Sequence, residues 1–126
     1  MMYSTINEMN REALGEIKEQ FDNNRVVCEK VVGLFHLLSN KPRFRIVCML
    51  MHGEACVQDI AFVISGGKMS NISQQLKMLR LSGVVKKRRE GKQLLYSIAD
   101  EKVARLVKFL RTEFLEDQPL SNYTKP

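Results

Sequence analysis

Short polar side chains recur along one face of the stretch 68–81, directly before a run of basic residues. The residues concerned are Ser70, Asn71, Ser73, Gln74 and Lys77. Hydroxyl, amide and ammonium groups of this kind can hydrogen-bond to base edges and phosphates at close range. A solvated helix face more often carries long charged side chains. This composition therefore indicates a surface that contacts nucleic acid.

The next segment supplies positive charge beside that surface. Residues 84–90 and 93–99 are strand-like runs, joined by a short turn at Gly91 and Lys92. The stretch 68–96 contains eight Lys or Arg residues and one acid, a net charge of +7, whereas the whole chain carries +6 and the remainder therefore −1. A solvated charge run is the alternative interpretation. Because the charge excess is confined to one helix and one hairpin, we expect a DNA-binding face that includes Lys87, Arg88, Arg89 and Lys92.

Cysteine and histidine are the other residues whose types and spacing could do chemistry. Cys48, His52 and Cys56 are spaced by four, which would allow Cys48 and His52 to share a helical face and bind a soft metal. The alternative is that Cys48, Cys56 and Cys28 are small core residues. An odd cysteine count without close spacing predicts free thiols. Nothing in the chain completes a catalytic Cys/His site, so we expect neither an enzyme nor a cofactor.

Length and composition limit what these groups can belong to. The chain has 126 residues, 44% hydrophobic and 27% charged, which predicts one domain with its own core. No apolar run approaches the roughly 20 residues that a membrane span needs. The first residues lack the apolar core of a secretion signal. We therefore expect a cytoplasmic protein without membrane contact.

Helical periodicity predicts the elements that position the polar face. Thr5 and Glu8 resemble a capping box at the start of a helix over 6–21, which is interrupted at 22–24. A second helix is expected over 25–38, with an apolar stripe wide enough to be covered on two sides. Pro42 suits the first turn before a mostly buried helix over 43–52, which Gly53 ends. A short helix is expected over 55–64, followed by a turn at 65–67.

The polar-faced helix would start near 68–70, bury Met69, Ile72, Leu76 and Leu79, and stop at Gly83. Asp100 is a plausible N-cap for a last helix over 101–115. Two helices around a glycine turn, followed by a basic hairpin, predict a mostly α fold with a small β-hairpin, a winged helix-turn-helix. We divide the chain into a helical extension over 1–24, a DNA-binding domain over 25–116 and a flexible tail over 117–126.

Several stretches resemble the ArsR/SmtB family of bacterial repressors over roughly residues 30–115. They are RFRIVCML, EACVQDIA, SNISQQLKMLRLSGVVKKRREGKQLLYSI and the closing helix. The resemblance implies a homodimer, paired through its first and last helices, that binds an imperfect palindrome of double-stranded DNA and is released by an inducer. The stretch ISGGK is about one residue longer than the usual turn.

The resemblance also suggests where an inducer would act. EACVQD keeps Cys56 but has Gln58 where metal-sensing members have a second thiolate. The positions matching the closing-helix metal site are Asp100, Lys102, Glu113 and Glu116. The lysine adds a positive charge where the family has an imidazole, which argues against zinc there. Cys48 in IVCML matches the first thiol of members that sense persulfides or oxidants. Leu115 stands where those members have the partner thiol, and Cys28 could substitute for it if the helix over 25–38 packs beside the helix over 43–52. The implied function is a repressor released by thiol modification or a soft metal; the alternatives are a DNA-binding protein without an inducer and a protein-interaction module.

Overall fold

The structure, a computed structural model, describes residues 10–115, which divide into two compact units, one ending at His36 and the other beginning at Leu37. This division lies inside a helix, whereas the domain boundary expected after residue 24 remains a prediction. The predicted tail at 117–126 lies outside the described residues. Within residues 10–115, no helix is both long and apolar enough to cross a membrane.

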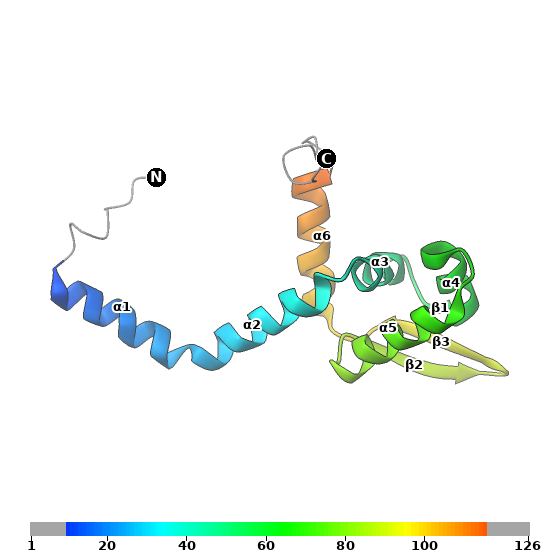
Figure 1. The fold of residues 1–126 in the computed structure, drawn as a ribbon, viewed down its shortest axis with the longest axis horizontal. Coiled ribbons are helices and arrows are strands. Elements are labelled where there is room, and N and C mark those ends of the chain that lie inside the picture. Colours follow the sequence, from blue (N-terminus) through cyan, green and yellow to red (C-terminus); the bar gives the residue numbers. More distant parts are fainter. Residues whose placement is uncertain (1–9, 116–126) are drawn as a thin grey trace. The chain divides into compact units, whose positions relative to one another are not determined.

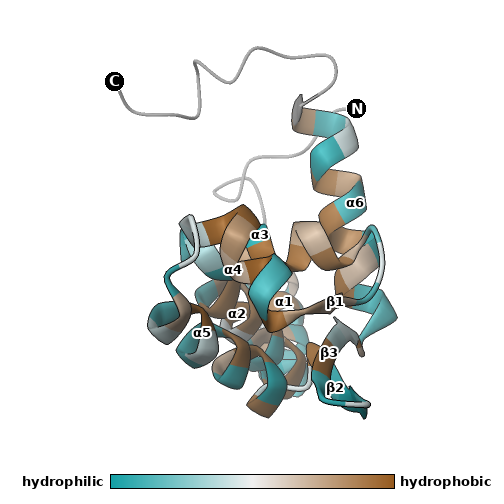
Figure 2. Ribbon diagram, turned by 90° about the vertical axis from the view of Figure 1, so that its right-hand side faces the viewer, coloured by the Kyte–Doolittle hydropathy of each residue, from teal (hydrophilic) through white to brown (hydrophobic). Residues whose placement is uncertain are grey.

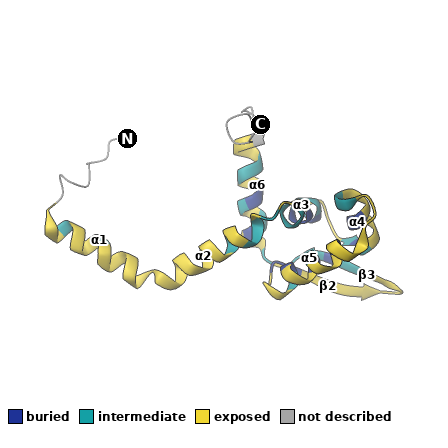
Figure 3. Ribbon diagram, viewed as in Figure 1, coloured by how far each residue is buried: buried dark blue, intermediate teal, exposed yellow. Residues whose placement is uncertain are grey.

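The N-terminal helices are α1 (Arg11–Asn23) and α2 (Arg25–Leu38). The predicted start at residue 6 is wrong, because Asn10 has an extended backbone and its side chain accepts a hydrogen bond of 2.8 Å from the amide of Ala13. Thr5 and Glu8 lie outside the described residues. The interruption predicted over 22–24 is confined to Asn24, because α1 continues through Asn23, whereas the bounds of α2 are as predicted. Neither helix contains a buried residue in the single chain (Figure 3).

The second unit contains a winged helix-turn-helix (Figure 1). Its elements, in chain order, are α3 (Lys41–Leu50), β1 (Ala55–Cys56), α4 (Val57–Ser65), α5 (Met69–Leu81), β2 (Val85–Glu90), β3 (Gln93–Ile98) and α6 (Glu101–Leu115). Helix α3 begins and ends two residues earlier than predicted. Asn40 caps it through a hydrogen bond of 3.0 Å from the amide of Arg43, and Pro42 lies in its first turn.

A third strand was missed. Ala55 and Cys56, predicted as the start of a helix, instead form β1, which pairs antiparallel with β3 through Ala55↔Tyr96 and Cys56↔Leu95. The sheet order is β1-β3-β2, and the hairpin register runs from Val85↔Ile98 to Glu90↔Gln93. Helix α4 therefore starts at Val57 directly from a strand, with Cys56 at its N-cap position.

The core lies among α3, α4, α5, the sheet and the first half of α6. Its fully buried large side chains are Ile46, Val47, Ile60, Ile72, Leu76, Leu79 and Val107. Met69 does not join them, since 39% of its surface remains exposed at the first position of α5. Three of the four residues predicted to face inward from this helix are thus confirmed. The side chain of Asp100 caps α6 as predicted, because its Oδ1 accepts a hydrogen bond of 2.9 Å from the amide of Lys102.

Helix α5 ends at a glycine as predicted. Gly83 has a φ of 79°, a conformation that residues with a side chain rarely adopt. Its amide donates to the carbonyl of Arg80 at 3.0 Å, and the amide of Val84 donates to that of Leu79 at 3.0 Å. This pair of bonds is the Schellman motif, which reverses the chain and sends it into β2.

Candidate nucleic-acid interface

The polar face predicted for α5 lies on the surface. Its members Ser70, Asn71, Ser73, Gln74 and Lys77 are all exposed, while Ile72, Leu76 and Leu79 on the opposite face are fully buried. The helix is held to α4 by a turn in which Gly66 and Gly67 have φ values of 66° and 100°. The hydroxyl of Ser65 donates to the carbonyl of Lys68 at 2.8 Å and closes this turn. We name the exposed residues the polar face of α5.

The hairpin of β2 and β3 carries the basic residues. Lys86, Lys87, Arg88, Arg89 and Lys92 are exposed, and β2 is coloured as strongly hydrophilic in Figure 2. Successive side chains of a strand point to opposite faces, so Lys87 and Arg89 share one face and Lys86 and Arg88 the other. Among residues 10–115, no carboxylate forms an ion pair with Lys87, Arg89, Lys92 or Lys77. These cations are available to an anionic partner.

Arg88 is already engaged within the chain. Its guanidinium donates from Nε to Oε2 and from Nη2 to Oε1 of Glu54, both at 2.7 Å, and Nη2 also donates to Oε2 of Glu90 at 2.8 Å. Arg88 lowers the pKa of the Glu54 carboxyl, chiefly through these hydrogen bonds. In this conformation, the contact expected between Arg88 and a DNA phosphate would compete with two carboxylates. Sequence reasoning missed Glu54 because the pair is separated by 34 positions.

A chain of hydrogen bonds lies beside the polar face of α5. Nη1 of Arg43 in α3 donates to Oε1 of Gln75 at 2.9 Å, and Nε2 of Gln75 donates to Oδ1 of Asn71 at 3.1 Å. The Nε of Arg43 donates to the carbonyl of Leu37 at 2.7 Å. Gln75 was not among the predicted site residues, because an amide in a helix gives no sign of its partner on another helix.

The three cysteines are free thiols with different exposure. Cys28 is exposed on α2, Cys56 is buried, and Cys48 is half-buried on α3. Burial raises the pKa of the Cys48 thiol, an effect that the positive charge of Arg111 partly offsets. A bond between Cys28 and Cys48 remains a prediction.

Metal chemistry finds little support in the described part of the chain. Helix α3 ends at Leu50, so His52 lies in the turn after it and does not share a helical face with Cys48 as the spacing had suggested. Between residues 10 and 115, no group of three or more His, Cys, Asp or Glu side chains is arranged to hold a metal ion. Glu116, a position of the closing-helix metal site, lies outside the described residues.

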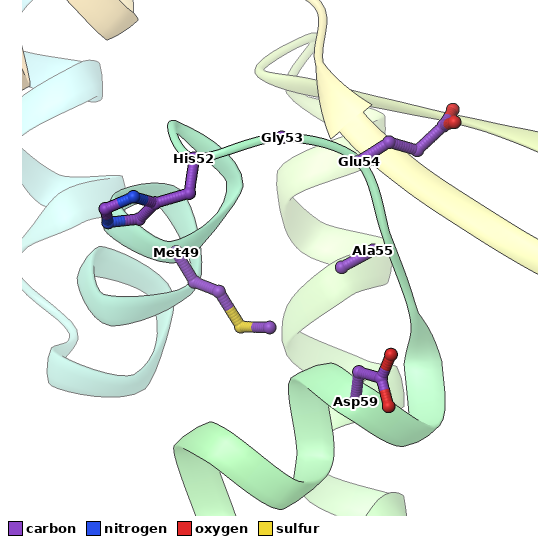
Figure 4. A pocket seen from close by; sticks show the side chains of 6 residues that line it. All are labelled: Met49, His52, Gly53, Glu54, Ala55 and Asp59. Atoms are coloured by element: carbon purple, nitrogen blue, oxygen red, sulfur yellow. The ribbon is translucent and has the colours of Figure 1, made fainter.

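A surface depression lies beside the turn that follows α3. It has a volume of about 370 Å³ and is lined by Met49, His52, Gly53, Glu54, Ala55 and Asp59. Figure 4 shows that the side chain of Glu54 extends away from Met49 and Asp59 and toward the strands. The carboxylate of Glu54 is therefore directed to Arg88, and the depression contains no convergent set of polar groups.

Comparison with known proteins gives consistent matches. Residues 40–87, from α3 to the start of β2, match the model of a family described as "Bacterial regulatory protein, arsR family". A biofilm growth-associated repressor from Xylella fastidiosa is 35% identical over 109 residues, which cover 86% of this chain and 93% of that protein.

Solved structures agree with the sequence comparison. The crystal structure of the transcriptional repressor BigR from Xylella fastidiosa matches with a TM-score of 0.64 and 35% identity, over 86% of this chain and 100% of that one. The NMR structure of a homodimeric winged helix-turn-helix DNA-binding domain from Mycobacterium bovis matches with a TM-score of 0.64 and 33% identity, over 73% and 84% of the two chains. The matched proteins are thus described as repressors or DNA-binding domains.

Proposed function

This chain belongs to the ArsR family of bacterial regulatory proteins, and we propose that it is a sequence-specific, dimeric DNA-binding repressor of transcription. The observation that carries the proposal is the polar face of α5. Five short or cationic side chains are exposed on a helix whose other face is fixed in the core by three fully buried residues. Such a helix can enter a major groove, about 12 Å wide, without rearrangement.

Each part of the interface has a distinct role in this proposal. Ser70, Asn71, Ser73, Gln74 and Lys77 would lie in or beside the major groove, where amides and hydroxyls reach base edges. Lys87, Arg89 and Lys92 on the hairpin would contact backbone phosphates or the minor groove. Arg88, also expected at the phosphates, would first have to exchange Glu54 and Glu90 for them.

A homodimer would pair two such interfaces. Large apolar side chains are exposed on α2 and α6, including Phe35 at 58% and Phe109 at 59%. Exposed apolar surfaces of this kind indicate an interface, and a twofold dimer would cover the same surface on both copies. The homodimeric domain from Mycobacterium bovis supports this part of the proposal. Two half-sites related by a twofold axis form an imperfect palindrome.

Release by thiol modification is the finer part of the proposal. Cys48 is half-buried on α3, directly after the fully buried Ile46 and Val47. A polar or bulky adduct at this thiol would be costly to accommodate in the packing around α3, against which α5 lies. A soft metal is the other inducer considered, and the described residues offer no ligand cluster for it.

Fluorescence anisotropy would test the proposal, using the full chain, a duplex selected from a random library and a scrambled duplex of equal length. We expect clear preference for the selected duplex and a palindromic consensus. If six to ten phosphates are neutralised, log affinity should fall against log salt with a slope of about −0.9 per phosphate. Equal affinity for both duplexes would contradict sequence-specific function. Absence of binding at low salt would favour a protein-interaction module.

A further inference from the structure

The side chains of Arg43, Gln75 and Asn71 form a directed chain of hydrogen bonds that ends on the polar face of α5. Arg43 donates to the oxygen of Gln75 at 2.9 Å, and the nitrogen of Gln75 donates to the oxygen of Asn71 at 3.1 Å. Arg43 and Gln75 are half-buried, whereas Asn71 is exposed. This series of hydrogen bonds therefore runs from half-buried residues to an exposed residue that would face DNA.

The direction of this chain follows from what each group can do. A guanidinium is a donor only, whereas an amide has an accepting oxygen and a donating NH2 that a flip of the side chain exchanges. Arg43 can therefore face only the oxygen of Gln75. The NH2 of Gln75 is left to face Asn71 and must meet its oxygen. The orientation of both amides is thus set by one arginine.

Arg43 is itself held in place on two sides. Its Nε donates to the carbonyl of Leu37 at 2.7 Å, near the C-terminal end of α2. Its backbone amide donates to the Oδ1 of Asn40 at 3.0 Å, the N-cap bond of α3. Because the guanidinium is anchored to the backbone, the positions of the groups that it orients are set before any ligand binds.

We propose that Arg43 and Gln75 are positioning residues that set the hydrogen-bonding polarity of Asn71, so that Asn71 offers its NH2 to DNA. This inference rests on the proposed function. A free asparagine can pair with adenine through its oxygen and its NH2 together. Here the oxygen of Asn71 already accepts from Gln75, which leaves the NH2 as the group that Asn71 would present to DNA. At the base that it faces, Asn71 would favour acceptors such as guanine N7 and O6 or thymine O4, and would disfavour cytosine, whose major-groove edge offers a donor.

Replacement of Gln75 by glutamate should reverse this polarity. One oxygen of the carboxylate would still accept from Arg43, and the other would face Asn71 as an acceptor. Asn71 would then turn its NH2 toward the new carboxylate and its oxygen toward DNA. In binding assays with duplexes that differ by single base pairs, Gln75→Glu should shift the preference at one position by about five-fold toward cytosine or adenine, the net effect of one hydrogen bond.

Asn71→Asp should produce the same shift by a different route. One carboxylate oxygen would accept from Gln75, and the other would face DNA as an acceptor. Gln58→Glu is the matched charge control, because Gln58 is exposed on α4 and is not part of the hydrogen-bond chain. The control should lower the affinity for all duplexes together, in a salt-dependent way, without changing the preference at any position.

The outcomes separate this inference from the function on which it rests. If the unmodified protein prefers no sequence, the proposed function fails. If the protein is sequence-specific but Gln75→Glu and Asn71→Asp leave every base preference unchanged, the polarity proposal is overturned. Circular dichroism would establish that each variant folds. If Gln75→Glu does not fold, Asn71→Asp, which changes an exposed residue, decides the result alone.

Discussion

The guanidinium of Arg88 in β2 donates two hydrogen bonds of 2.7 Å to the carboxylate of Glu54. Glu54 immediately precedes β1. The pair therefore connects β2, at one edge of the sheet, with the segment before β1, at the other edge. Both groups are on the surface, where ion pairs stabilise little on their own. The more important effect of the pair is that it fixes the position of the Arg88 side chain.

The Glu54–Arg88 pair should make stability depend on pH. Because the pKa of Glu54 is lowered in the folded protein, the pair's contribution is present above the ordinary glutamate pKa of about 4.3 and is lost as pH falls through the folded-state value. In thermal unfolding, Glu54→Gln should lower Tm at pH 7, and the difference from the unmodified protein should shrink by pH 4.

Glu16→Gln is the control for this experiment. Glu16 is exposed on α1 and has no ion pair within residues 10–115. A Tm difference for Glu54→Gln that stays constant from pH 7 to pH 4 would argue against the ionic contribution.

Neighbouring arginines of β2 should differ in their effect on DNA binding. Arg89 has no ion pair in the described chain, whereas Arg88 is paired with two carboxylates. Arg89→Ala should weaken binding to all duplexes and reduce the salt slope by about 0.9 for each phosphate that is no longer neutralised. Arg88→Ala should reduce the slope less, because a phosphate contact of Arg88 would compete with Glu54 and Glu90. Equal slopes for the two variants in a salt titration would contradict this division of roles.

Gln74→Ala should affect base preference instead. Gln74 is exposed on the polar face of α5, and its amide is long enough for a bidentate interaction with adenine. Removing such an interaction reduces discrimination at one position and leaves the salt slope as it was. Competition between single-base-pair variants of the selected duplex would measure this. A uniform decrease in affinity for all variants would assign Gln74 to the DNA backbone.

Gly83→Ala should destabilise the second unit. Gly83 has a φ of 79°, and an alanine Cβ there would meet no atom within 4 Å, so the cost comes from the backbone conformation alone. That cost is roughly 1–2 kcal/mol, measurable by urea unfolding. Gly15→Ala, in the middle of α1 and with equally open space around its Cβ, should not destabilise. A neutral result for Gly83→Ala would mean that the turn is not constrained as described.

Cys48 should react slowly in the folded protein. Half-burial limits access to its thiol, and the raised pKa reduces the fraction of nucleophilic thiolate at neutral pH. Pulse alkylation with iodoacetamide, followed by mass spectrometry of the Cys48 peptide, should show a lower rate in buffer than in urea. The rate should still be rising above pH 9. Equal rates in buffer and urea would show that Cys48 is freely accessible.

The polar-faced helix and the hairpin could be predicted because their signals are local. The signals are apolar residues spaced by three and four positions in α5, Gly83 after it, and two strand-like runs around Gly91, each within a few residues of the element that it defines. Strand β1 could not be predicted in this way. Ala55 and Cys56 are too few to show a period, and they become a strand only because Tyr96 and Leu95 pair with them.

Side-chain partners were also beyond local reasoning. The basic run of β2 predicted a cationic surface, but only the structure places Glu54 against Arg88 and leaves Arg89 without a carboxylate partner among the described residues. In the sequence, Gln75 likewise looks like any helical amide, and only the structure shows that Arg43 of α3 donates a hydrogen bond to it. Surface type therefore follows from composition, whereas the role of each residue depends on its partners across the fold.

Strand β1 passes into α4 without an intervening loop and is hydrogen-bonded to β3 of the hairpin. A two-stranded ribbon alone would be marginally stable in water, whereas here β1 pairs with the middle of β3, at Leu95 and Tyr96, and adds a third strand. The hairpin therefore cannot move far relative to α4 without breaking the pairing between β1 and β3. A duplex bound by both α5 and the hairpin would have to adapt its groove width and bend to this spacing. Binding would then depend on how easily the DNA sequence deforms, in addition to its base edges.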